Sequence, residues 1–410
     1  MEHFLEKAKS ASRVLATLGG SERNRILREM AEALRANTMN IIEGNALDMK
    51  KADEDNLSSS LKDRLMLDEK RIESMAVAIE EIAALKDPIG KVIEGWVTES
   101  GLKIEKVSIP IGMIGIIYES RPNVTSDTAA LCFKSSNGCV LKGGKEAEAS
   151  NKIIADVLQQ VLIRNNLPKE LIALLPDATR EGVAKLIKMD KYVDLIVPRG
   201  GEALIRFVSQ NASVPVVKHD KGQCHLYIDK DANIEDALKI AVNAKVQRPS
   251  ACNSIETLLI DSSIAQEVLP IFKQVFVREN TLLKGCAQTR EIIEVAEASD
   301  EDFDTEYLAN ILNIRVVDGV DGAISHIVRF GSGHSESIIT ENITTAERFM
   351  ESIDAAAVYV NASTRFTDGG EFGFGAEVGI STNKLHARGP MGVEGLTTYK
   401  YKVYGKGQIR

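Results

Sequence analysis

The sequence predicts an α/β protein with two domains, each built on a parallel sheet. A chain of 410 residues is too long for one hydrophobic core and suggests two domains of ordinary size. From Ile109 onward, short apolar runs typical of buried strands alternate with segments whose apolar residues recur every three or four positions, as in helices. A strand followed by a helix, repeated along the chain, indicates parallel sheets covered on both faces.

The residues before this alternation predict a helical lead-in and a β-hairpin. Residues 1–88 carry apolar side chains at helical spacing, and we expect them to serve as scaffold. Over 90–109 the apolar period changes to two on both sides of Gly101, which predicts a hairpin. One face of that hairpin needs cover, and we expect a second subunit to provide it. The carboxyl-terminal run LTTYKYKVYGKGQI alternates in the same way and predicts another strand.

The segment from Ile109 to Asp220 predicts a Rossmann-like unit. Its candidate strands are MIGIIYE, GCVLKG, LIALLP, VDLIVPR and VPVVKHD. The alternation begins again after Gly222, which predicts a second α/β domain with Cys252 early in it.

Composition disfavours several classes of function. The net charge of -9 and the pI near 5.4 give no basic footprint for nucleic acid. Five cysteines without a CxxC spacing, and an amino terminus without the apolar core of a signal peptide, predict a reducing, cytoplasmic location. The longest apolar run, Ile109–Tyr118, is too short to span a bilayer. Six histidines without an HExxH pattern make a bound metal unexpected.

Cys252 stands in a sequence suited to covalent chemistry. Its neighbours are small or polar, Arg248 lies four residues upstream, and an apolar strand-like run, Thr257–Ile260, follows. A nucleophilic thiol needs access and nearby positive charge, whereas an inert core thiol usually has apolar neighbours. The residues alone leave both interpretations open, because most free cysteines are inert.

Lysine and glycine follow two of the predicted strands. Lys142 ends GCVLK and is followed by two glycines and Lys145, and Gly200-Gly201 follows VDLIVPR ahead of a helix. Ligands of open α/β sheets bind at the carboxyl ends of strands, and a helix amino terminus suits a phosphate. Exposed lysines and a plain tight turn are the alternatives at these positions.

Arg121 and Asn123 follow a third strand, MIGIIY. The Asn123 amide could donate a hydrogen bond to an oxyanion, and Arg121 could hold a phosphate or carboxylate. A capping turn ahead of the next helix is the alternative interpretation.

Several long strings resemble the aldehyde dehydrogenase superfamily, in matching order from end to end. They are IYESRPNVTSD, VLKGGKEA, VQRPSACNSIETLL, VVDGVDGAISHIVRFGSGHSESI, VNASTRFTDGGEFGFGAEVGIST and KLHARGPMGVEGLTTYKY. The resemblance is greatest to the branch that acts in proline biosynthesis. It implies an aldehyde-dehydrogenase-like fold with Cys252 as nucleophile. The implied parts are an NADPH-binding domain over 1–222, a catalytic domain over 223–385 and a carboxyl-terminal segment over 386–410, with the hairpin and last strand serving homo-oligomerisation.

The resemblance also implies a cofactor site. A superfamily lysine at the place of Lys142 meets the adenosine ribose, and the turn Gly200-Gly201 is expected beside the cofactor phosphates. NAD-dependent members often carry a glutamate where this chain has Lys145, so a cation there agrees with NADP. The glutamate that contacts the nicotinamide ribose maps onto Glu306.

For the substrate, the resemblance and the chemistry imply cationic side chains near Cys252. The oxyanion donor maps onto Asn123 or Arg121, and the amide of Asn123 is the better donor. The substrate is expected to carry a phosphate, a carboxylate and an ammonium. The candidates to hold it are Arg121, Arg248, Lys218 and Arg365.

Two positions depart from the wider pattern. Hydrolytic members use a glutamate to activate water, and the matching segment VVKHDKGQC has Lys218 and His219 near that place. Loss of that glutamate suits a reductase, because water would destroy its thioester. Phe330 stands where histidine or tyrosine is usual, and a packing ring would serve there.

The resemblance therefore implies NADPH-dependent reduction of L-glutamate 5-phosphate to L-glutamate 5-semialdehyde and phosphate through a cysteine thioester. Because the acyl phosphate is labile, direct transfer from glutamate 5-kinase is a partner hypothesis. Two alternatives stay open: an NAD(P)-dependent oxidation of a free aldehyde, and a non-catalytic nucleotide-binding protein that keeps the fold.

Overall fold

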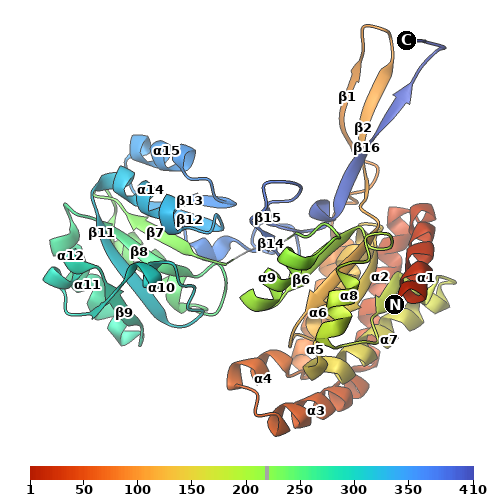
Figure 1. Ribbon diagram of the computed structural model, residues 1–410, viewed down its shortest axis with the longest axis horizontal. Coiled ribbons are helices and arrows are strands. Elements are labelled where there is room, and N and C mark those ends of the chain that lie inside the picture. Colours follow the sequence, from red (N-terminus) through yellow and green to blue (C-terminus); the bar gives the residue numbers. More distant parts are fainter. Residues whose placement is uncertain (218–220) are drawn as a thin grey trace. The chain divides into compact units, whose positions relative to one another are not determined.

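The computed structural model describes residues 1–217 and 221–410, which form two compact units (Figure 1). The first unit comprises Met1–Lys218, Gly373–Gly379 and Met391–Arg410, and the second comprises His219–Phe372 and Ile380–Pro390. The predicted domain assignments at 1–222, 223–385 and 386–410 stay a prediction, because they concern which function each part performs.

The first unit opens with helices, in agreement with the predicted lead-in. They are α1 (Glu2–Ser12), α2 (Gly20–Ala36), α3 (Thr38–Glu54), α4 (Ser59–Leu65) and α5 (Glu69–Ala84), with a 3-10 turn over Arg13–Thr17. Ile26, Met30 and Leu34 of α2 are fully buried at helical spacing, so this helix turns one apolar face inward. The guanidinium of Arg23 pairs with Asp87 at 2.7 Å and ties the start of α2 to the end of the helical segment.

A four-stranded parallel sheet follows, in the order β5-β4-β3-β6. Its strands are β3 (Met113–Tyr118), β4 (Gly138–Lys142), β5 (Ile172–Leu174) and β6 (Leu195–Arg199). Its helices are α6 (Asn123–Lys134), α7 (Glu148–Arg164), α8 (Arg180–Leu186) and α9 (Glu202–Asn211), with 3-10 turns over Lys145–Ala147 and Lys169–Leu171. Both central strands are buried along their whole length, as expected of a sheet covered on both faces.

The prediction that VPVVKHD forms a strand is wrong for residues 214–217, the part of this run that the structure describes. Only Val216 forms a bridge, with Ile196, and the remainder of 214–217 is irregular. Pro215 accepts from the Ile196 N–H through its carbonyl but has no N–H to donate, so it cannot complete a ladder. Residues 218–220 lie outside the described part of the chain.

The predicted hairpin and last strand form one antiparallel sheet in the order β1-β2-β16. These strands are β1 (Val92–Val97), β2 (Lys103–Pro110) and β16 (Thr397–Tyr404), the last preceded by a 3-10 turn over Glu394–Leu396. Figure 1 shows this sheet extending away from the rest of the first unit. Every residue of β1 is exposed, as is almost all of β16.

The second unit is built on seven parallel strands in the order β10-β9-β11-β8-β7-β12-β13. They are β7 (Cys224–Ile228), β8 (Ile255–Asp261), β9 (Leu282–Gly285), β10 (Ala296–Glu297), β11 (Ile311–Val317), β12 (Ser335–Ile339) and β13 (Ala357–Val360). Its helices are α10 (Ile234–Val246), α11 (Ala265–Arg278), α12 (Ala287–Ile292), α13 (Asp300–Phe303), α14 (Gly319–Phe330) and α15 (Ile343–Ser352). A 3-10 turn over Thr364–Phe366 and the short pair β14 (Ile380–Ser381) and β15 (Gly389–Pro390) complete it.

Alternate residues of β8 supply the two faces of this sheet. Leu258 and Ile260 join the core that α10 and α11 cover, which also contains Phe272. Leu259 faces the other way and joins the core of α14 and α15, with Phe349. Helices therefore cover both faces, as predicted (Figure 1). No helix within 1–217 and 221–410 is long and apolar enough to cross a membrane.

Candidate active site

Cys252 lies in the turn between α10 and β8, at the amino-terminal edge of the seven-stranded sheet. The N–H of Ala251 donates to the carbonyl of Arg248 at 3.0 Å, and the N–H of Ser254 donates to the carbonyl of Ala251 at 3.0 Å. The Ser254 hydroxyl donates to the carbonyl of Ala244 in the last turn of α10, at 3.1 Å. These bonds hold the turn that presents the half-buried thiol.

The Cys252 carbonyl is held on two sides. The Cys224 thiol donates to it at 3.3 Å. The backbone of Gly222 passes so close that a Cβ on this residue would lie 2.0 Å from the Cys252 oxygen. Any side chain at position 222 would displace the turn, so this glycine is part of the site, although no local sequence pattern marks it as functional.

A distant segment, Ser363–Thr367, packs against this turn. The Asn253 side-chain amide donates to the carbonyls of Thr367 at 2.9 Å and Arg365 at 3.3 Å. The Thr364 hydroxyl donates to the Asn253 carbonyl at 2.6 Å. These contacts bring Arg365 close to Cys252 across more than a hundred residues of sequence.

Three predicted residues share one electrostatic neighbourhood. Burial lowers the pKa of Arg365, the positive charge of Arg248 lowers that pKa further, and a thiolate at Cys252 raises it. The Arg365 Nε donates to the side-chain oxygen of Gln247 at 3.0 Å, which orients the guanidinium. Two guanidinium groups in this neighbourhood can hold an anionic substrate.

Glu306 belongs to the same part of the second unit. Burial raises the pKa of the Cys224 thiol well above its usual value, and the negative charges of Glu336, Cys252 and Glu306 add to this rise. Two residues after Glu306, the Leu308 N–H donates to a carboxylate oxygen of Glu256 at 3.3 Å. This bond helps to anchor the segment that carries Glu306.

Glu256 itself forms a fully buried ion pair with Lys245, with 2.7 Å between Nζ and Oε2. Burial raises the pKa of Glu256 to about 7, while Lys245 holds it down. An acid inside the apolar strand SIETLLI is a signal that sequence analysis could have used, because a buried carboxylate needs a partner.

The strand order of the first unit indicates where a ligand is expected to bind. Because α6 leads from β3 to β4 on one side, while β6 lies on the other side of β3, the carboxyl ends of β3 and β6 form a topological switch point. Gly200 and Gly201 make the turn there, and Gly201 is the N-cap of α9. The Gly201 N–H donates to a carboxylate oxygen of Glu119 at 3.0 Å.

Lys142 and Lys145 lie at the end of β4. The Lys142 side chain is buried and its Nζ donates to the carbonyl of Ala178 at 2.8 Å, whereas Lys145 is exposed. Burial lowers the pKa of Lys142, and the carboxylates of Glu146, Asp177 and Glu119 counteract this.

A pocket of about 580 Å³ opens beside these strand ends. Gly143, Gly144, Pro176 and Ala178 contribute to its lining. A Cβ on Gly143 would lie 2.1 Å from the Asn151 amide nitrogen, so a side chain there would close part of the space. The end of β4 therefore places two glycines in the wall of a pocket whose volume is in the range of small-molecule sites, and the buried Lys142 bonds to Ala178 of the same wall.

Asn123 and Arg121 lie at the start of α6, also in the first unit. The Asn123 amide donates to Asp127 at 2.9 Å, which fixes its orientation and leaves the second N–H of the amide for another acceptor. Burial raises the pKa of Asp127 to about 6, while the Asn123 bond lowers it. The choice between Asn123 and Arg121 as oxyanion donor stays a prediction.

Two further predicted positions have different outcomes. Lys218, and His219 beside it, lie outside the described residues. Phe330 is a buried packing ring, 5.9 Å from Phe303 and 4.7 Å from His326 between ring centroids.

Comparisons with known proteins agree with this architecture. Residues 1–282 match the model of the aldehyde dehydrogenase family. The chain is 75% identical to the gamma-glutamyl phosphate reductase of Sulfurovum sp. (strain NBC37-1), with all of both chains covered. It is 46% identical to the crystal structure of gamma-glutamyl phosphate reductase from Thermotoga maritima, with a TM-score of 0.97, covering 100% of this chain and 99% of that one. An acetylating aldehyde dehydrogenase from Geobacillus thermoglucosidasius shares the fold, with a TM-score of 0.69 at 20% identity, covering 100% of this chain and 97% of that one.

Proposed function

Because the chain belongs to the aldehyde dehydrogenase family and, within it, to the gamma-glutamyl phosphate reductases, we propose that it reduces L-glutamate 5-phosphate to L-glutamate 5-semialdehyde with NADPH. This reaction is the second step of proline biosynthesis from glutamate. The observation that supports it most is the Cys252 turn, where two guanidinium groups accompany a half-buried thiol.

In this proposal the Cys252 thiolate attacks the acyl carbon of the substrate. A carbon–sulfur bond forms, the bond from the acyl carbon to the phosphate oxygen breaks, and inorganic phosphate leaves with the electron pair. Arg248 and Arg365 hold the anionic groups of the substrate, and Asn123 donates to the oxyanion. When bound, the reduced nicotinamide supplies the hydride that converts the thioester to the aldehyde, and Cys252 departs as thiolate.

The cofactor assignment rests on the strand ends of the first unit. Lys142 and Gly143 lie beside a pocket of about 580 Å³, which fits the adenosine part of a dinucleotide. Lys145 adds an exposed cation that suits a 2'-phosphate, and hence NADP. Gly201 lies at the switch point, where a pyrophosphate could accept its N–H in place of Glu119. Glu306 is assigned to the nicotinamide ribose.

The decisive experiment runs the reaction in reverse. NADPH formation from NADP and pyrroline-5-carboxylate, the cyclised semialdehyde, is followed by absorbance with and without inorganic phosphate, on wild type and Cys252→Ala. We expect absorbance growth that requires phosphate and disappears in the variant. Growth without phosphate would identify an enzyme that oxidises a free aldehyde to an acid, and no growth in either protein would favour a non-catalytic binding protein.

Two partners are part of the proposal. A second copy of the chain would cover the exposed sheet β1-β2-β16, where Val97 and Tyr401 present apolar surface to solvent. Direct transfer of the labile acyl phosphate from glutamate 5-kinase would protect it from water. In a coupled assay, flux that survives a large excess of an acyl-phosphate trap supports transfer, and complete loss of flux opposes it.

A further inference from the structure

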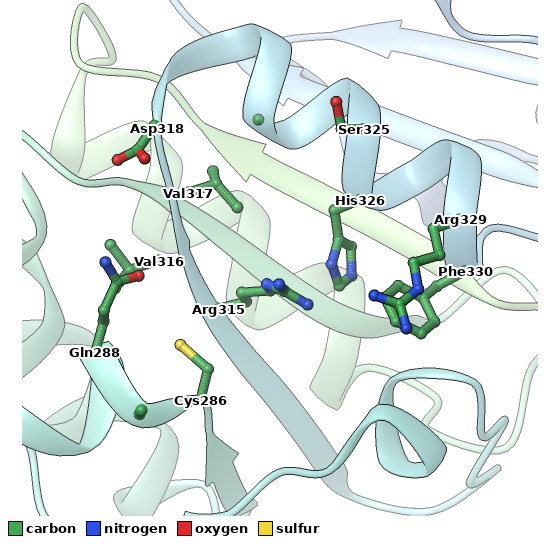
Figure 2. Close-up of a pocket in the computed structure, with 12 residues that line it drawn as sticks. Cys286, Gln288, Arg315, Val316, Val317, Asp318, Ser325, His326, Arg329 and Phe330 are labelled. Atoms are coloured by element: carbon green, nitrogen blue, oxygen red, sulfur yellow. The ribbon is translucent and has the colours of Figure 1, made fainter.

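A second pocket, of about 530 Å³, lies in the second unit between β11, α14 and the start of α12. Helix α14 turns Gly322, Ser325, His326 and Arg329 toward it at a spacing of three and four residues, and Arg315 reaches in from β11 (Figure 2). None of the residues described around Cys252 lines this pocket, so the reaction proposed above does not account for it.

His326 is the unusual residue of this pocket. Its side chain is only 5% exposed, and neither ring nitrogen has a hydrogen-bond partner among residues 1–217 and 221–410. The rings of His225, Phe303 and Phe330 pack around it, with centroids at 5.3, 5.2 and 4.7 Å. Burial, followed by the positive charges of His225, Arg315 and Arg329, lowers the pKa of His326 to about 2. The ring is therefore neutral and keeps one N–H to donate.

Two arginines, Arg315 and Arg329, line the pocket near His326, and one of them lacks a carboxylate partner among the described residues. Within the described part of the chain, no carboxylate lies at ion-pair distance from Arg315, whose guanidinium lies 5.4 Å from the centre of the Phe303 ring. Arg329 pairs with Asp300 and lies over the Phe330 ring at 4.7 Å. Like charges around a buried imidazole repel one another, and an anion between them would remove that repulsion.

The far end of the pocket has the opposite charge. Asp318 is the N-cap of α14, and Arg329 lies in its last turn, so a helix about 18 Å long separates them. Figure 2 shows Asp318 on the other side of Val317 from His326. Arg315 comes three residues before Asp318, roughly 10 Å along the chain. No ion pair joins their side chains within the described residues, so the Arg315 end of the pocket stays cationic.

We propose that this pocket binds a small oxyanion, a carboxylate or a phosphate group, between Arg315 and Arg329, with His326 donating a hydrogen bond to it. The planar guanidinium of Arg315 matches either group through two parallel N–H donors. Gln288 lines the opposite wall and adds amide donors for the remainder of the ligand. The site is separate from the Cys252 turn, and the inference does not depend on the reaction proposed for that turn.

Cys286 provides a direct probe, because its side chain lines the same pocket and is partly exposed. The full-length protein is alkylated with iodoacetamide in inorganic phosphate or in malonate, at an ionic strength matched with potassium chloride. Peptide mass spectrometry then gives separate rate constants for Cys286 and Cys252. At an anion concentration about nine times its dissociation constant, labelling of Cys286 is expected to slow about tenfold, because it scales with the unoccupied fraction of sites.

Variants test whether the pocket causes this protection. Arg315→Gln should abolish protection of Cys286, whereas the exposed control Arg278→Gln should retain it. His326→Phe keeps an aromatic ring and should weaken protection, which gives a second test if Arg315→Gln does not fold. Protection by phosphate alone, by malonate alone or by both identifies the preferred oxyanion. The proposal is overturned if neither anion protects Cys286, or if the arginine and histidine variants are protected as well as wild type. Protection of Cys252 alone assigns the anion to the active site and also overturns it.

Discussion

Acidification is expected to destabilise the second unit through His326. The folded environment lowers the pKa of this imidazole from 6.5 to about 2, with burial as the largest cause. Because the folded pKa lies below the unfolded value, the unfolded chain binds more protons at acid pH, and stability falls as the pH drops below 6.5. Between about pH 7.5 and about pH 5.5, one such group costs about 1.4 kcal/mol of unfolding free energy.

His326→Phe isolates this contribution. The phenyl ring can occupy the same space among Phe303 and Phe330, and it has no nitrogen to protonate or leave unpaired. Because the ring centroids of His225 and His326 lie 5.3 Å apart, the comparison measures the loss of His326 together with any effect on its neighbour His225.

The assay is hydrogen exchange of peptides from β8 and β11 across a urea series at both pH values. Because β8 and β11 both belong to the second unit, exchange of these peptides measures the unfolding free energy of that unit alone. Wild type is expected to lose about 1.4 kcal/mol more than the variant between the two pH values. Equal losses in both proteins would refute the reasoning, because His326 would then be protonated in the folded state or would already have a partner.

Three further predictions concern charge and surface. Lys245→Met leaves Glu256 buried without its cation and should lower the free energy of urea unfolding by about 3 kcal/mol. The double variant Lys245→Met with Glu256→Leu should recover most of that loss. An equal loss in the single and double variants would contradict the view that the two residues stabilise each other. Lys145→Glu should lower the kcat/KM preference for NADPH over NADH by at least about tenfold, since it replaces a charge-assisted bond with repulsion. The control Lys188→Glu, at an exposed lysine that does not line the pocket, should not lower it. Val97→Asp places a charge on a side chain that is 68% exposed and should reduce the mass measured by light scattering, whereas an unchanged mass would locate the subunit contact elsewhere.

The fold was largely predictable because it follows from periodicity. The helical lead-in, the hairpin around Gly101 and the alternation of strands and helices all correspond to elements of the structure. The order of strands is a different matter, because it depends on which buried faces meet. Nothing local places β11 between β8 and β9. The Val214–Val217 run was misjudged for a local reason, since composition favoured a strand but Pro215 cannot donate to a ladder.

The candidate active site divides in the same way. Small polar neighbours and Arg248 marked Cys252 from within a few residues, because access and positive charge are local requirements of a nucleophilic thiol. The second guanidinium is a consequence of topology. Arg365 arrives because the chain, after adding β13 at the edge of the sheet, returns along Thr364 to the amino-terminal end of β8. The charge that surrounds Cys252 is therefore a property of the whole second unit, and a substitution that displaces the Ser363–Thr367 segment would weaken the site without touching the thiol.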